Sequence, residues 1–310
     1  MTVKIGYLIP TREHVMSGDH STSSLIDRAR LAADLGFDSL WIGDSLTARP
    51  RHDPLTLLAG IATAVPGPQL GTAVLLPALR NPVVLAHQLA TIDQLSEGRL
   101  IVGAGIAADA PTIRAEFASA GVPFDGRVGR LMEGVRLCRA LWQGEPVTWD
   151  GRWTLDEQSL APTPYRPGGP PIWLAAGVDQ GIKRAATHFD GWMPIGPDPD
   201  TFAQRNQLFR QTAEAQNRKQ LTTSLYLTIC IMEDESAADL AINDYLEQYY
   251  GVPAAAMRSI QACCGGSIET VAEFMNSYIS AGAEHLIVRV VGKHSDTLTS
   301  IANYRHLLQS

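Results

Sequence analysis

The segment from Gln69 to Ile106 constrains the fold more than any other part of this sequence. It contains an apolar strand-like run, QLGTAVLLP, a helix-like run that begins after Asn81-Pro82 and ends at Gly98, and a second strand-like run, LIVGAGI. Proline suits the first turn of a helix because no backbone N–H is needed there, and glycine commonly ends one. Both strand-like runs are apolar on both faces, which is typical of parallel strands covered by helices. The segment therefore predicts one β–α–β unit.

The same alternation continues along most of the chain. Strands are predicted at 3–9, 39–43, 70–75, 100–105, 172–176, 191–195, 224–232 and 285–291, and helices at 24–35, 54–64, 82–96, 127–142, 180–188, 200–216, 237–250, 268–281 and 296–308. Eight such units indicate a single (β/α)8 TIM barrel domain over residues 1–310. A doubly wound open sheet is the alternative, and it needs fewer strands and a nucleotide-binding fingerprint after the first one.

Three segments interrupt this alternation. Residues 106–126 form a long connection interrupted by two prolines, residues 145–171 contain a predicted β-hairpin around Asp150-Gly151, and residues 251–266 are irregular. Insertions at the C-terminal ends of barrel strands usually build the substrate site. Because these three segments are rather apolar, they favour an uncharged or weakly polar organic substrate.

Composition excludes several classes of function. The formal net charge of −7 argues against non-specific nucleic-acid binding, and no apolar run approaches the ~20 residues of a membrane span. The first residues predict a strand rather than a signal peptide, so we expect a cytoplasmic protein. The four cysteines lack the spacing of a zinc site or a disulfide framework, so we expect reduced thiols and no metal.

Two glycine motifs follow predicted strands. Gly103 to Ala108 match the dinucleotide pattern G-x-G-x-x-A, but Pro111 follows before a helix can form, so a loop close to a ligand or plain turn glycines are the alternatives. Ala176-Gly177 precede a predicted helix, and backbone N–H groups at a helix N-terminus favour a phosphate. A tight turn without a ligand is the alternative there.

The sequence resembles the bacterial luciferase-like flavin- and deazaflavin-dependent oxidoreductases. The resemblance rests on ADLGFDSLWIGDSL, DPLTLLAGIATAV, LGTAVLLPALRNPVVLAHQLATIDQLSEGRLIVGAG, GVPFDGR, PPIWLAAG and RAATHFDGWMPI, in that order. It covers most of the chain and is weakest between residues 201 and 262. It implies a TIM barrel, commonly dimeric, that binds FMN or the deazaflavin coenzyme F420.

The resemblance also implies roles for individual residues. Asp44 matches the acid beside the isoalloxazine or deazaflavin ring, and Ala73-Val74 match a non-proline cis peptide behind the ring. Leu76 and Gly105 match positions around the ring and the ribityl chain. The phosphate-binding turn matches Ala176, Gly177 and Val178.

The chain departs from the family pattern at two positions. Many members carry a histidine directly after the acid that matches Asp44, where this chain has Ser45, which is no base near neutral pH without a partner. Ile106 stands where sugar-phosphate dehydrogenases of the family carry a carboxylate. His14 and His52 lie after the first two predicted strands and are candidates for the missing catalytic base; solvated loop histidines are the alternative.

Other residues have two interpretations. Trp149 and Trp153 either wall the substrate site or pack the hairpin against the barrel, and Arg80 either lies at the site or caps a turn. Glu116 either joins the site through its long loop or is a surface charge. Core packing is expected for Trp41 and Trp173.

These observations predict a luciferase-like oxidoreductase that uses F420 for hydride transfer to or from a small organic substrate. An FMN-dependent monooxygenase that uses reduced flavin, oxygen and a separate reductase is the alternative within the family. A catalytically degenerate flavin-binding protein and a nicotinamide-linked open-sheet dehydrogenase are further alternatives. We expect a homodimer.

Overall fold

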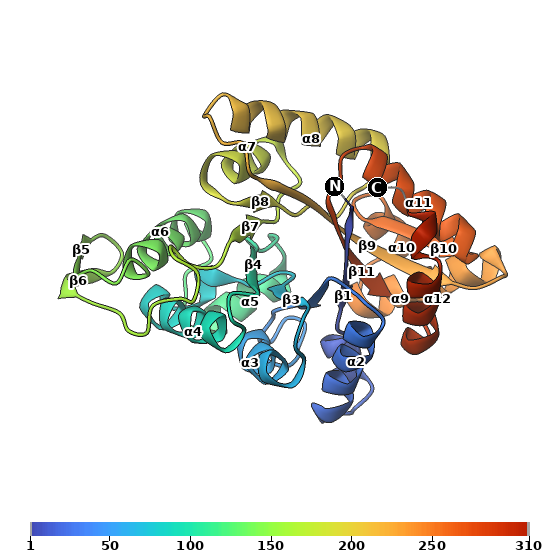
Figure 1. Cartoon of the computed structure of the whole chain (residues 1–310), viewed down its shortest axis with the longest axis horizontal. Helices are drawn as coiled ribbons and strands as arrows, with labels where there is room; N and C mark the ends of the chain where they lie inside the picture. Colours follow the sequence, from blue (N-terminus) through green and yellow to red (C-terminus); the bar gives the residue numbers. More distant parts are fainter. Residues whose placement is uncertain (1, 309–310) are drawn as a thin grey trace.

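The computed structural model describes residues 2–308, in which strands and helices alternate (Figure 1). The strands are β1 Lys4–Leu8, β2 Ser39–Ile42, β3 Gln69–Thr72, β4 Leu100–Ala104, β5 Val147–Asp150, β6 Thr154–Gln158, β7 Ile172–Leu174, β8 Gly191–Trp192, β9 Thr222–Ile231, β10 Ala262–Gly266 and β11 His285–Val290. The helices are α1 Thr11–Met16, α2 Ser23–Asp34, α3 Pro54–Ala64, α4 Pro82–Leu95, α5 Pro111–Ser119, α6 Arg127–Leu141, α7 Asp179–His188, α8 Pro199–Glu214, α9 Glu235–Tyr250, α10 Ala254–Arg258, α11 Ile268–Ser280 and α12 His294–Asn303, with short 3-10 turns η1 Pro77–Leu79 and η2 Arg305–Leu307.

Eight parallel strands close into a barrel in the order β1, β2, β3, β4, β7, β8, β9, β11. Lys4 pairs with His285 between β1 and β11, and Gly191 pairs with Thr222 between β8 and β9. These two pairings complete the ring, and each predicted strand corresponds to one barrel strand. The predicted TIM barrel is therefore confirmed.

Two tryptophans fill the barrel interior. The Trp41 and Trp173 rings lie 5.4 Å apart, and both residues are buried, as expected from the sequence. Neighbouring strands carry glycines where a side chain would collide with these rings: a Cβ on Gly71 would lie 2.3 Å from Trp41, and one on Gly191 would lie 2.5 Å from Trp173. The two large rings thus occupy the space that side chains at these glycine positions would otherwise fill.

A histidine occupies the same interior. His285 Nε2 lies 2.6 Å from Ser39 Oγ, which accepts a hydrogen bond from Trp41 Nε1 at 2.7 Å. Burial and the nearby Lys4 lower the pKa of His285 to about 3. The imidazole is therefore neutral in the folded protein over most of the pH range.

Four regular elements lie where the sequence predicts loops. Pro111 begins α5 instead of interrupting a long connection, which agrees with the tolerance of helix first turns for proline. The segment 251–266 contains α10 and β10, and β10 pairs with β9 beyond the point where β8 ends. The sequence does not predict β10 because glycine is uncommon in strands. Glycine is needed here because a Cβ on Gly265 would lie 2.8 Å from the backbone of α9. The fourth element is α1, which carries His14.

Asn81 caps α4, since its Oδ1 accepts hydrogen bonds from the Val83 and Val84 N–H groups. Two of the residues that line its buried face are Leu85 and Leu89. Helical spacing predicts that Val83, Val84, Ala86, His87, Ala90, Thr91 and Gln94 share one face of this helix. That prediction is wrong, because Val84, His87, Thr91 and Gln94 are exposed.

We expect the buried histidine to make the protein sensitive to acid. An unfolded histidine binds a proton near pH 6.5, whereas folded His285 stays neutral down to about pH 3, so stability falls as the pH drops through this window. Between pH 6 and pH 5 this histidine accounts for a loss of about 1 kcal/mol of unfolding free energy. Urea unfolding at several pH values should show that His285→Gln removes this part of the pH dependence of the unfolding free energy. The exposed His87→Gln control should retain it, and an unchanged slope in His285→Gln would contradict the assignment.

Candidate functional site

Asp44 lies at the C-terminal end of the barrel, two residues after β2. Its side chain is 1% exposed, and Oδ2 accepts a hydrogen bond from the Leu76 N–H at 2.9 Å. The Arg80 guanidinium contacts both carboxylate oxygens, with Nη2 3.1 Å from Oδ1. Burial opposes the charge of Arg80, but Asp44 and Asp53 more than compensate and raise its pKa. Asp44 is therefore a fixed, charge-compensated hydrogen-bond acceptor, and Arg80 lies beside it rather than only capping a turn.

The strand beside Asp44 carries an extra residue. Gly71 of β3 pairs with Ile101 of β4, and Leu75 pairs with Ala104. The chain therefore advances four residues after Gly71 while β4 advances three. The Leu75 N–H donates to the Gly103 carbonyl at 2.7 Å and restores the pairing beyond this point. The chain therefore bulges between Thr72 and Leu75.

The glycines after β4 fit this bulge. A Cβ on Gly103 would lie 2.1 Å from the Thr72 carbonyl oxygen, and a Cβ on Gly105 would lie 2.5 Å from Val74 Cγ2. No helix begins directly after them, since α5 starts only at Pro111. Close strand packing therefore accounts for these glycines better than a dinucleotide fingerprint does.

The bulge contains the Ala73–Val74 peptide bond, which is cis, as the family resemblance implies. Both residues pack against the side chains of the barrel interior. Gly43 lies across from them, since its Cβ would be 3.5 Å from the Ala73 carbonyl oxygen and 2.3 Å from Arg51 Nη1. Leu76, the next predicted cofactor residue, is buried beside the bulge.

The Ser45 side chain, in the loop after β2, is engaged in hydrogen bonds. Its Oγ donates to Glu116 Oε1 at 2.6 Å and accepts a hydrogen bond from the Arg49 N–H at 2.9 Å. The same carboxylate oxygen accepts three backbone N–H groups, those of Leu46, Thr47 and Ala48. Glu116 is fully buried and ties the loop after β2 to α5. Neither proposed interpretation of Glu116, a substrate contact or a surface charge, describes this anchoring.

His14 and His52 lie beside each other, with ring centroids 6.0 Å apart. His14 Nε2 is 2.8 Å from the Ser21 carbonyl and 3.2 Å from Asp19 Oδ2, while His52 Nε2 is 3.1 Å from the His20 carbonyl. Both rings therefore hold the surface loop between α1 and α2. His52 Nδ1 is buried without a hydrogen-bond partner.

The predicted phosphate turn precedes α7. Ala176, Gly177 and Val178 lead into the helix, and no side chain caps its first N–H groups. Gly177 and Val178 are exposed, and a Cβ on Gly177 would meet no atom within 4 Å. The turn has open space next to uncapped backbone donors, which suits an anion.

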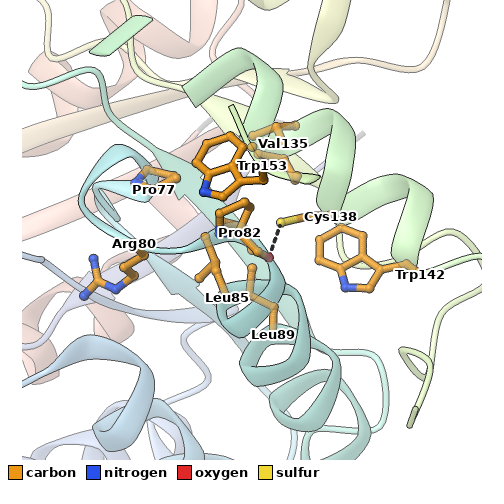
Figure 2. Close-up of a pocket in the computed structure, with 12 residues that line it drawn as sticks. Pro77, Arg80, Pro82, Leu85, Leu89, Val135, Cys138, Trp142 and Trp153 are labelled. Atoms are coloured by element: carbon orange, nitrogen blue, oxygen red, sulfur yellow. Dashed lines mark hydrogen bonds between the residues drawn. The ribbon is translucent and has the colours of Figure 1, made fainter. Parts of the chain in front are cut away.

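The β5–β6 hairpin is confirmed and packs on α6 (Figure 1). Trp153 lines a cavity of about 10 Å³ between α4 and α6, together with Pro82 and Cys138 (Figure 2). Glu133 of α6 accepts the Arg152 N–H at 2.6 Å, and Arg130 lies 4.9 Å over the Trp153 ring. The cavity is too small for a cofactor, so Trp153 packs the insertion against the barrel.

A larger cavity, of about 1080 Å³, lies at the opposite end of the barrel, where Lys4, Gln69, Thr222 and His285 line it. It contains none of the predicted site residues. Within residues 2–308, no cluster of three or more potential metal ligands occurs. The same part of the chain has no helix long and apolar enough to span a membrane.

A family model described as luciferase-like monooxygenase matches residues 3–285, and the chain belongs to this family. The F420-dependent glucose-6-phosphate dehydrogenase of Kineococcus radiotolerans is 31% identical over 253 residues, which cover 78% of this chain and 71% of that protein. Relatives thus include F420-dependent enzymes, and the family resemblance inferred from the sequence is confirmed.

Two solved structures share the fold. An F420-dependent secondary alcohol dehydrogenase in complex with an F420–acetone adduct has a TM-score of 0.86 at 18% identity, with 100% of both chains covered. The oxygenating constituent of 3,6-diketocamphane monooxygenase from Pseudomonas putida, in complex with FMN, has a TM-score of 0.75 at 16% identity, with 97% of both chains covered. The same barrel therefore occurs with either cofactor.

We expect Glu116 to be essential for the loop after β2. Glu116→Ala removes the acceptor of four hydrogen bonds and leaves their donors, one of them the buried Ser45 hydroxyl, without it, so we expect the free energy of unfolding to fall by about 2–4 kcal/mol. Ser45→Ala removes one of these bonds and should cost about 1 kcal/mol. Urea unfolding measures both values, and a Glu116→Ala loss no larger than that of Ser45→Ala would contradict the anchoring role.

Proposed function

We propose that the protein is an F420-dependent oxidoreductase that transfers a hydride to or from a small organic substrate. The observation that carries the proposal is the buried Asp44 carboxylate, fixed by Arg80 and the Leu76 N–H at the C-terminal end of the barrel. Active sites of TIM barrels lie at this end. When bound, the deazaflavin would supply the two-electron hydride chemistry, and the chain would bind, orient and shield it.

The residues present fit such a cofactor. The turn at Gly177 offers open space and uncapped N–H groups for a phosphate. The bulged segment at Ala73-Val74 and the fixed carboxylate of Asp44 would border the ring, and Leu76 and Gly105 would lie around it. Because the Ser45 hydroxyl is engaged by Glu116, the side chain after Asp44 would position the loop and would not move a proton.

The choice of F420 over FMN rests on two observations. The Kineococcus relative is named as an F420-dependent enzyme, and its match covers most of this chain. The Ala175-Ala176-Gly177 turn and the form of the LLPALRNP segment favour the deazaflavin branch of the family.

Titration of the purified protein with F420 and FMN, each oxidised and reduced, tests the proposal through tryptophan fluorescence. We expect tight binding of F420 and weaker binding of FMN. Preferential binding of reduced FMN with oxygen consumption would instead identify a flavin-dependent monooxygenase. Binding of neither cofactor would contradict the proposal.

Gly177→Glu should weaken cofactor binding at least tenfold. The new side chain has room, so the variant folds, but its carboxylate places negative charge where the phosphate is proposed to bind. Gly60→Glu on α3 is the matched control, because Gly60 is also exposed with open space around its Cβ position. Equal affinity in both variants would contradict the assignment of the phosphate turn.

A further inference from the structure

Arg289 of β11 is a buried cation surrounded by aromatic rings. It is 5% exposed, and its guanidinium carbon lies 4.2 Å from the Tyr249 ring centroid, 4.9 Å from that of Tyr226 and 5.6 Å from those of Tyr245 and Tyr250. Nη1 donates to the Tyr250 hydroxyl at 2.9 Å, while Nε has no hydrogen-bond partner. The rings favour the cation but carry no formal charge.

Arg289 donates its hydrogen bond to a tyrosine rather than to a carboxylate. Burial opposes its charge, but the surrounding tyrosines more than compensate and raise its pKa. Burial raises the pKa values of Tyr226 and Tyr245 far above the ordinary phenol value, so both stay neutral at physiological pH. Glu13 of α1, an acid on a neighbouring element, accepts a hydrogen bond from Tyr245. The Tyr226 hydroxyl, which is also buried, has no partner.

Three more arginines lie against the same tyrosines. The guanidinium carbon of Arg12 is 4.7 Å and that of Arg51 5.8 Å from the Tyr249 ring centroid, and that of Arg49 is 4.9 Å from the Tyr250 centroid. Arg12 Nε and Nη1 are buried without partners. Burial lowers the pKa of Arg12, Tyr249 and Glu13 oppose this shift, and the charges of Arg51 and Arg49 add to it.

We call Arg12, Arg49, Arg51 and Arg289, with the tyrosines around them, the arginine–tyrosine cluster. Four arginines meet there, with the Glu13 carboxylate bonded to one of their tyrosines, in a chain whose formal net charge is −7. A buried charge without a counter-charge is costly, and unpartnered guanidinium N–H groups add to that cost. An anion that accepts these hydrogen bonds would relieve both penalties.

The arginine–tyrosine cluster is next to the proposed ring site. Arg51 Nη1 lies against Gly43, which precedes Asp44 and faces Ala73. Tyr226 belongs to the group of interior side chains against which Ala73 and Val74 pack. A ligand held by the arginines would therefore lie close to the reacting end of a bound cofactor.

We propose that the arginine–tyrosine cluster binds the carboxylate or phosphate group of an anionic organic substrate. That the anion is a substrate rests on the proposed function. That the cluster binds an anion is argued from the cluster itself. It replaces the uncharged substrate that the apolar loops favour, because the charges come from α1, the loop after β2, and β11 rather than from those insertions. The cofactor's own anionic groups are the other source of such an anion.

Calorimetric titration with benzoate, its neutral analogue benzamide and inorganic phosphate tests the proposal. The full chain is used with and without cofactor, so that anion binding and cofactor binding are measured separately. Benzoate or phosphate should bind at least tenfold more tightly than benzamide. Arg12→Gln and Arg289→Gln should each weaken this binding at least tenfold, and Arg30→Gln, an exposed arginine of α2, should leave it unchanged.

Four outcomes decide the proposal. Loss of anion binding in Arg12→Gln and Arg289→Gln, with unchanged cofactor affinity, supports a substrate site. A tenfold loss of cofactor affinity in these variants assigns the cluster to the cofactor and overturns the proposal. Equal binding of benzoate and benzamide by the wild-type protein also overturns it. If Arg289→Gln does not fold, half-buried Arg12→Gln decides alone: unchanged anion binding together with a lower Tm would show a purely structural role.

Discussion

The extra residue that β3 carries between Gly71 and Leu75 shapes the C-terminal end of the barrel. Because the chain bulges there, the Leu76 N–H reaches Asp44, and the following turn brings Arg80 onto the same carboxylate. The adjacent strand accommodates the bulge with glycines where side chains would collide with β3. The buried acid and the bulged strand therefore depend on each other, since moving either would leave hydrogen-bonding groups unpaired in the interior.

Buried carboxylates and buried guanidinium groups at this end of the barrel differ in their hydrogen-bond partners. The carboxylates of Asp44 and Glu116 are buried and accept several hydrogen bonds: from a guanidinium and a backbone N–H for Asp44, and from a hydroxyl and three backbone N–H groups for Glu116 Oε1, while Glu116 Oε2 has no partner. The guanidinium groups of Arg12 and Arg289 instead face tyrosine rings and retain unpartnered N–H groups. Hydrogen bonds within the fold hold the acids in place, whereas the proposed anionic ligand would supply the acceptors that the arginines lack.

The sequence predicts the barrel well because alternation of strands and helices is a local, repeated signal. It misses α5 because Pro111 fits either a break or a helix start, and it misses β10 because glycines that adapt to α9 replace the usual apolar residues. Ser45 shows the limit for the site: its departure from the family pattern is visible in the sequence, but its partner Glu116 is 71 residues away. Arg289 and its tyrosines likewise meet only through tertiary packing.

A crystal structure of the protein with F420 bound would test the central claim most directly. We expect the phosphate to accept hydrogen bonds from backbone N–H groups at the start of α7, and the ring to lie between Asp44 and Ala73-Val74. Binding in the cavity at the N-terminal end of the barrel, beside His285, would contradict the account, as would a phosphate held at Gly103 to Ala108.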